Sequence, residues 1–149
     1  MCRSCEIDAT LDTFPIYERL YVDDHWRVSH GWSSLPGWLV VSLRRHALSL
    51  HELNAEETRL LGGLQQAASV ALHEIVGSER TYVMLFAEHR DYHLHFHIVP
   101  RMPWFGPDDF AGSVFRYLNV PEEQQVPTAE RERLAMEIGN ALRSGTIQA

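Results

Sequence analysis

One short stretch of the chain alternates strictly between polar and apolar positions. Residues 92–99 are Tyr-His-Leu-His-Phe-His-Ile-Val, so three histidines alternate with Leu, Phe and Ile. A period of two is typical of a half-buried β-strand, and it places His93, His95 and His97 on one face. Along a strand, residues two apart lie about 6–7 Å from each other. The pattern therefore predicts a strand that presents three imidazoles in a row, and we expect Pro100 to end its ladder.

A longer stretch has the 3–4 spacing of an amphipathic helix. Its apolar residues form one stripe, which predicts a helix over 55–76. Asn54 followed by Glu57 is a typical helix start, and Gly77 is a typical helix end. The pair Gly62-Gly63 weakens a helix interior, so we expect it to serve a close approach of this helix to the sheet.

The rest of the chain contains short strands, loops and one more helix. Runs of β-branched and aromatic residues predict the strands, with an Asp-Asp turn between the first two. The predicted strands are 16–22, 25–30, 38–43, 81–86 and 92–99. Residues 1–13 and 101–127 are predicted to be irregular, with one helix over 108–118 as an option, and a last helix is predicted over 128–143. The predicted fold class is therefore α+β: a mostly antiparallel sheet, one long helix packed on it, and a C-terminal helical tail.

Length and charge narrow the classes of function. A chain of 149 residues is typical of one domain. Its net charge of −7 argues against a general nucleic-acid binder or an anionic-membrane binder. No apolar run approaches the roughly 18 residues that span a membrane, and the N-terminus lacks the apolar core of a signal peptide. We therefore expect a cytoplasmic protein without a membrane partner.

Basic residues gather near the histidine strand. Arg44, Arg45 and His46 are consecutive, and Arg90 and Arg101 flank the alternating stretch. A locally basic pocket on an acidic protein suits a small anionic substrate. The alternative is that these arginines are ordinary solvated surface charge.

The only two cysteines, Cys2 and Cys5, form a C-x-x-C motif. In a reducing compartment this spacing favours a metal or redox role over a structural disulfide. Tetrahedral zinc needs two ligands beyond the two thiolates, and two unpaired thiols near a chain terminus are the simpler alternative. A thioredoxin-like role is disfavoured, because no apolar strand precedes the motif.

Three alternating histidines support two kinds of chemistry. A neutral imidazole is a nucleophile that needs no deprotonation. His95 lies in the middle, with an imidazole on each side for hydrogen bonds to phosphate oxygens, and one neighbour can deliver a proton to a leaving group. The alternative is a metal centre in which all three histidines bind zinc and leave one position open for water.

The stretch 93–99 resembles the signature of the histidine-triad (HIT) superfamily of nucleotide hydrolases and transferases. Residues 38–46, followed by Leu53 and the long helix, resemble the strand–His–helix segment of that family. The resemblance covers about residues 14–100, which we expect to form the core of a single domain over 1–149, with 101–149 as a C-terminal extension. It implies a five-stranded antiparallel sheet with a long helix, in a homodimer.

The resemblance also implies roles for the histidines. In such proteins the middle histidine, here His95, attacks the α-phosphate and forms a covalent nucleotidyl intermediate. The third, here His97, contacts the phosphate, and water then releases a nucleoside monophosphate. Several bacterial HIT proteins, and the related galactose-1-phosphate uridylyltransferases, use an N-terminal C-x-x-C in a structural zinc site. Carried over to this chain, the zinc ligands are Cys2, Cys5, His46 and His93, with His51 as the alternative to His46.

The chain departs from the family pattern in three places. A short hairpin, 88–91, replaces the Gly-rich loop before the triad, so that His89 and Arg90 stand where the family has phosphate-binding groups. The acidic residue that contacts ribose, expected near Gly31, is absent, and the Pro-Gly-His of some members is Pro-Gly-Trp at 36–38. Two functions stay open: a hydrolase or transferase of nucleotide phosphoesters, phosphoanhydrides or phosphoramidates, or a non-catalytic module that binds a nucleotide or a protein partner.

Overall fold

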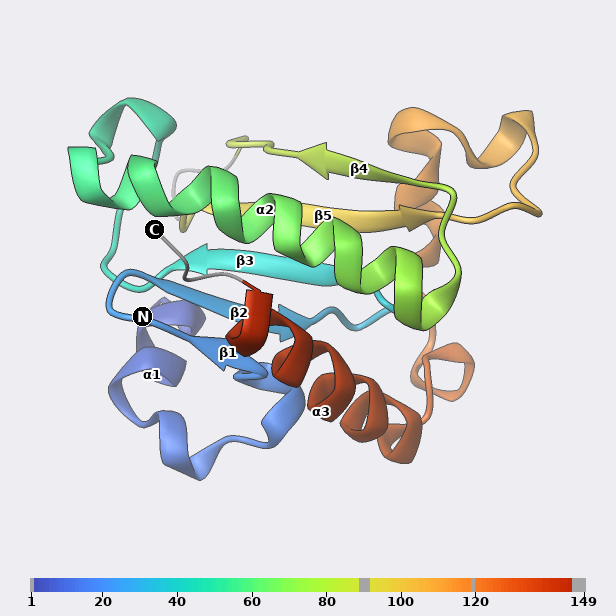
Figure 1. Ribbon diagram of the computed structural model, residues 1–149, viewed down its shortest axis with the longest axis horizontal. Coiled ribbons are helices and arrows are strands. Elements are labelled where there is room, and N and C mark those ends of the chain that lie inside the picture. Colours follow the sequence, from blue (N-terminus) through green and yellow to red (C-terminus); the bar gives the residue numbers. More distant parts are fainter. Residues whose placement is uncertain (1, 89–91, 119, 146–149) are drawn as a thin grey trace.

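The fold is α+β, with helices packed on one face of an antiparallel sheet (Figure 1). The computed structural model describes residues 2–88, 92–118 and 120–145. In these residues the five strands, in the order β1-β2-β3-β5-β4, are β1 Tyr21–Val22, β2 Trp26–His30, β3 Leu39–Leu43, β4 Arg80–Met84 and β5 His95–Arg101. The α-helices are α1 Arg3–Ala9, α2 Ala55–Val76 and α3 Thr128–Gly145. The predicted sheet, long helix and C-terminal helix are confirmed.

The two faces of the sheet have different partners. Phe96 and Ile98 belong to the main core beneath α2 and α3, which lie on the same face of the sheet (Figure 1). His95 pairs with Ser42, and His97 pairs with Val40 of β3. Because paired residues share a face, these four side chains lie on the opposite side, which we call the cavity face.

Helix α2 begins and ends where its caps predict. The Asn54 side chain accepts from the Glu57 N–H at 2.9 Å, and the Glu57 carboxylate accepts from the Asn54 N–H at 2.9 Å. Gly77 ends the helix with φ +73°. The role expected for Gly62 and Gly63 is wrong: both are exposed, and a Cβ at either would meet nothing within 4 Å.

Two features predicted near the N-terminus are wrong. The first 13 residues are not irregular, because they contain α1. Residues 16–22 do not form one strand; they form a 3-10 helix, η2 (Ile16–Glu18), followed by the two-residue β1. Only Tyr21 and Val22 pair with β2, whereas Tyr17 turns away to stack under Arg131 of α3.

The end of β5 also differs from the prediction. Pro100 does not end the ladder, since it pairs with Thr81 and Arg101 pairs with Arg80. The pairing with β3 stops at Ile98, so the missing N–H of Pro100 breaks no bond there.

The segment after β5 covers part of the cavity face. It folds into 3-10 turns rather than an α-helix, including η5 (Ala111–Tyr117). It builds a second buried cluster with residues from the loop before β3 and from β5: Leu35, Trp38, Val99, Phe105 and Val114. Among the residues described, no helix combines the length and the apolar character needed to cross a membrane.

Candidate functional site

A cavity of about 1100 Å³ lies on the cavity face. Strands β2, β3 and β5 supply its floor, and α1 and the loop after β2 supply its walls. Its lining includes the two triad histidines His95 and His97, the hydroxyls of Ser29 and Ser42, and the indole of Trp32. An imidazole pair, two hydroxyls and an aromatic ring thus share one solvent-accessible space.

The hydrogen bonds of His95 and His97 fix their protonation. His95 Nδ1 lies 2.7 Å from the His93 carbonyl oxygen, which can only accept, so this nitrogen carries the proton. The Nε2 of His95 therefore has a free lone pair. It lies 3.2 Å from His97 Nε2, inside the cavity. The geometry leaves His95 as the imidazole that offers a lone pair to a bound molecule.

Burial keeps these imidazoles neutral. It lowers the pKa of His95, against the opposing effect of its bond to the His93 carbonyl. The pKa of His97 falls to about 4 because of burial and, to a smaller extent, because of the neighbouring His95. Only the neutral imidazole has the lone pair that a nucleophile needs.

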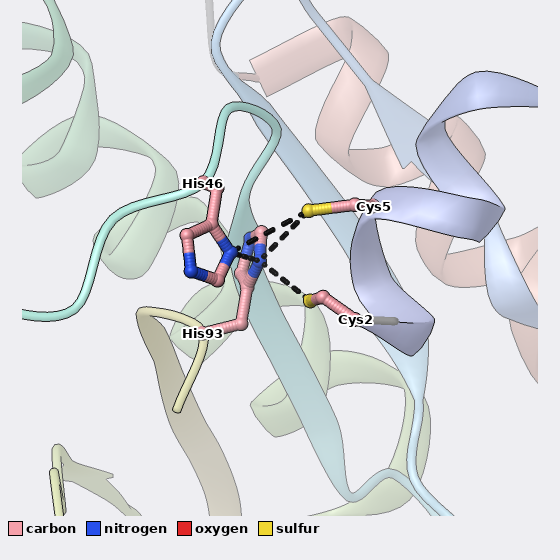
Figure 2. Close-up of side chains that lie close together, drawn as sticks. All are labelled: Cys2, Cys5, His46 and His93. Carbon is pink, nitrogen blue, oxygen red and sulfur yellow. Dashed lines mark hydrogen bonds between the residues drawn. The ribbon is translucent and has the colours of Figure 1, made fainter. Parts of the chain in front are cut away.

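Four side chains from three segments meet beside the triad (Figure 2). Cys2 is the N-cap residue of α1 and Cys5 lies within α1, whereas His46 follows β3 and His93 precedes β5. Their ligand atoms all lie within 4.8 Å of one another. His93 Nε2 donates to the Leu43 carbonyl, so its Nδ1 lone pair points at the two sulfurs.

Four of the six distances among these ligand atoms match a tetrahedral zinc site. With zinc–sulfur bonds of about 2.3 Å and zinc–nitrogen bonds of about 2.0–2.1 Å, a tetrahedron separates two nitrogens by about 3.3 Å and nitrogen from sulfur by about 3.5 Å. His46 Nδ1 and His93 Nδ1 lie 3.3 Å apart. The sulfur–nitrogen distances are 3.2 Å for Cys2 to His93, 3.5 Å for Cys5 to His46 and 3.6 Å for Cys5 to His93. The residues present therefore fit a closed Cys2His2 zinc site.

A buried arginine holds α1 against the sheet. Arg27 of β2 is 2% exposed. Its guanidinium donates to Asp8 at 3.2 Å, to Ser4 at 2.8 Å and to the Glu18 carbonyl at 2.9 Å. This network fixes the helix that carries the two cysteines over the ends of β3 and β5.

Other residues predicted for the site lie elsewhere. His89 and Arg90 fall outside the residues that the structure describes. His51 contacts Ser49 at 3.0 Å rather than the Cys2His2 group.

The basic pocket expected from Arg44, Arg45 and Arg101 is wrong. Arg45 forms a two-bond ion pair with Glu57, at 2.6 and 2.8 Å, and Arg101 donates to Glu79 at 2.9 Å. Arg44 donates to the Asp23 carbonyl at 2.7 Å, and none of these three arginines lines the cavity.

Two contributors to the site were missed by the sequence analysis. Trp38 donates its indole N–H to His97 Nδ1 at 3.1 Å, and Phe115 of η5 packs edge-on against His97 with ring centres 5.0 Å apart. The Pro-Gly-Trp departure at 36–38 was the available signal for Trp38. No sequence pattern pointed to Phe115, because its position depends on how the segment after β5 folds back.

Comparisons with known proteins agree with this geometry. No family model and no curated protein sequence matches the chain. A Zn-bound histidine triad family protein from Mycobacterium smegmatis is similar in structure, with a TM-score of 0.67, 20% identity and 96% of each chain covered. This chain has the histidine-triad fold. Two other similar structures share the histidine-triad fold. One is a HIT-like protein involved in cell-cycle regulation from Bartonella henselae, with a TM-score of 0.64, 24% identity and 88% of this chain and 90% of that chain covered. The other is a hypothetical histidine triad nucleotide-binding protein from Sulfolobus tokodaii, with a TM-score of 0.63, 18% identity and 96% of this chain and 93% of that chain covered.

Proposed function

We propose that the chain is a histidine-triad hydrolase or transferase that acts on a nucleotide phosphoester, phosphoanhydride or phosphoramidate through a covalent intermediate on His95. The observation that carries the proposal is the state of His95. Its Nδ1 proton is held by the His93 carbonyl at 2.7 Å, and its Nε2 lone pair faces the cavity, 3.2 Å from His97 Nε2. This is the arrangement that a nucleophilic imidazole requires.

The proposed reaction has two displacements at phosphorus. In the first, His95 Nε2 forms a bond to the α-phosphorus while the bond to the leaving group breaks, and the leaving group takes up a proton from water. In the second, water or another acceptor attacks the phosphorus and gives its proton to solvent, the P–N bond breaks and the imidazole is regenerated. The Nε2–H of His97 hydrogen-bonds a phosphate oxygen in both steps. We propose that His89 and Arg90 also contact the phosphate.

The cavity wall supports a substrate with an aromatic group. Trp32 is 40% exposed and lines the cavity. One side of its ring stacks on Arg131, whose guanidinium carbon lies 4.2 Å from the ring centre. Arg131 is also stacked on Tyr17 at 4.5 Å, so the indole is held as a firm surface for a base. Among the cavity residues described, the hydroxyls of Ser29 and Ser42 are donors for a sugar, in place of the acidic residue that is absent.

We propose that the Cys2His2 group holds a structural zinc ion. When bound, zinc would tie α1 to the loop after β3 and to the start of β5. The group supplies four ligands and leaves no open position for water, so the reaction uses His95 rather than the metal. The competing idea, that all three triad histidines share one metal, is not supported by the geometry. His93 Nδ1 points at the cysteines, whereas His95 and His97 face each other.

We further propose that residues 1–149 act as one domain that forms a homodimer. Strand β4 is at the edge of the sheet. Val83 in this strand and Phe86 just after it are 48% and 45% exposed. An exposed apolar edge of this kind suits pairing with a second copy. The cytoplasmic location inferred from the sequence stays a prediction.

The test is to trap the covalent intermediate. The protein is mixed with a dinucleoside polyphosphate or a nucleoside phosphoramidate, quenched in base because the P–N bond is acid-labile, and weighed by intact-protein mass spectrometry. We expect a nucleotidyl adduct on the wild type and on His73→Asn, which changes an exposed histidine away from the cavity. His95→Asn should give neither adduct nor turnover.

A different result would favour the second function. Tight nucleotide binding by calorimetry, without adduct or turnover on any substrate of the panel, would indicate a non-catalytic binding module. The missing Gly-rich loop before the triad is the sequence feature that motivates this alternative.

A further inference from the structure

A buried indole stands behind the triad. The Trp38 side chain is fully buried, and His97 is 8% exposed. The indole N–H points at His97 Nδ1 over 3.1 Å, with the two rings edge to face. An indole nitrogen donates and never accepts, so His97 Nδ1 must be the acceptor. The single proton of neutral His97 is therefore on Nε2, the nitrogen that faces His95.

The hydrogen bonds of the site consequently run in one direction. Trp38 donates to His97 Nδ1, His97 Nε2–H points at His95 Nε2 over 3.2 Å, and His95 Nδ1–H donates to the His93 carbonyl. Each imidazole receives a hydrogen on one nitrogen and gives one from the other. If the proton of His97 were on Nδ1 instead, the Nε2 lone pairs of His95 and His97 would face each other.

The indole has no freedom to turn away from His97. Gly31 lies against it so closely that a Cβ at that position would be 2.9 Å from Trp38 Cδ1. The Gly31 N–H also donates to the Trp38 carbonyl at 2.7 Å, and the Phe115 ring packs on the indole with centres 5.3 Å apart. Backbone and side chain of Trp38 are thus both held by neighbours that take no part in the reaction.

We propose that Trp38 is a positioning residue that locks His97 in the Nε2–H tautomer, so that His97 always presents a donor to the phosphate and leaves the lone pair of His95 for attack. This role rests on the function proposed above. When the phosphate of a substrate binds, the Nε2–H of His97 stops donating to the His95 lone pair and donates to a phosphate oxygen instead. The other tautomer would aim a lone pair at that anionic oxygen and repel it. Because an indole has no second protonation form near neutral pH, the lock works across the whole range in which His95 is neutral.

The test uses Trp38→Phe, which removes the donor and keeps a ring, and Trp26→Phe as the matched control. Trp26 is also fully buried, and its indole N–H donates to the Glu57 carbonyl at 3.1 Å, outside the cavity. The tautomer of His97 is read from ¹⁵N chemical shifts of the imidazole nitrogens at pH 7, which needs no substrate. We expect the Nε2–H form in the wild type and in Trp26→Phe, and a mixture of both tautomers in Trp38→Phe.

Kinetics then separate positioning from folding. We expect kcat of Trp38→Phe to fall by roughly tenfold, as for loss of one buried hydrogen bond, with KM changed less than about twofold. Trp26→Phe should keep both constants. The proposal is overturned if His97 stays in the Nε2–H form without the indole, or if its tautomers mix while kcat is unchanged. Absence of turnover by the wild type would refute the proposed hydrolase function, and the ¹⁵N spectra would still decide whether Trp38 sets the tautomer.

Discussion

His30 should make the stability of this fold strongly dependent on pH. The ring is 1% exposed. Its Nδ1 donates to the Gly31 carbonyl at 2.8 Å, and its Nε2 accepts from the Gly37 N–H at 2.9 Å. Both bonds need the neutral ring, because a protonated Nε2 would face the Gly37 N–H. Burial lowers the pKa of His30 to about 4, with smaller opposing effects from the Gly31 bond and Glu130 and a further lowering by Arg131.

The sign and size of the effect follow from this pKa. Between pH 6.5 and about 4 the unfolded chain binds a proton at this position and the folded chain does not. The contribution of neutral His30 to the free energy of unfolding is therefore fully present above pH 6.5, and it is lost as the pH falls toward 4. A pKa difference from 6.5 to about 4 corresponds to about 3 kcal/mol in total, and to about 2 kcal/mol at pH 5.

The assay compares urea unfolding of the wild type and His30→Gln at pH 8, 7, 6 and 5, followed by tryptophan fluorescence. The variant loses stability at every pH, since an amide fills the site less well. Between pH 8 and pH 5, however, the free energy of unfolding of the variant should fall by about 2 kcal/mol less than that of the wild type. All other ionisable groups are the same in the two proteins, so their contributions cancel in this difference. Parallel profiles for the two proteins would refute the reasoning, and His73→Gln, which changes an exposed ring, should follow the wild type.

Three further sets of substitutions have definite expected outcomes. Gly62→Ala should raise the free energy of unfolding by about 0.5–1 kcal/mol, because the added methyl meets nothing within 4 Å. Gly37→Ala should lower the free energy of unfolding, because Gly37 has φ +88° and an added Cβ would lie 2.9 Å from a leucine of α2. Chemical denaturation measures both changes. Cys5→Ser should lose bound zinc in elemental analysis of the purified protein, whereas His51→Ala should keep about one ion per chain; zinc retained by Cys5→Ser would contradict the ligand set. Glu57→Ala removes one half of the capping box of α2, the bond from the Asn54 N–H, together with the ion pair to a half-exposed arginine. We expect the free energy of unfolding in urea to fall by about 2 kcal/mol, with no change in bound metal.

Features with a strong local cause were predictable from the sequence. Helix α2 was placed to the residue, because Asn54, Glu57 and Gly77 are cap signals that act within a few residues. The two faces of β5 followed from the period of two alone. The C-x-x-C spacing pointed to a metal role for Cys2 and Cys5. That His46 and His93 complete the group came only from the resemblance, since Cys5 and His46 are 41 positions apart.

Features that depend on distant contacts were not predictable. Helix α1 has seven residues and buries only Ile7, so it shows no hydrophobic stripe. A helix this short is not stable by itself and exists here because Arg27 holds Asp8 and Ser4. The same reason applies to Trp38: its packing was foreseeable as core, but its bond to His97 joins residues 59 positions apart.

The cavity is assembled from both ends of the chain. Cys2 and Cys5 contribute one wall, and Leu118, just after η5, contributes another. The sheet between them needs only residues 21–101. All five strands therefore precede, in the chain, the segment that covers part of the cavity face. A fragment that ends at Arg101 would contain the sequence of every strand, but it would lack the Phe115 ring that packs on His97 and the side chains that α3 adds to the main core.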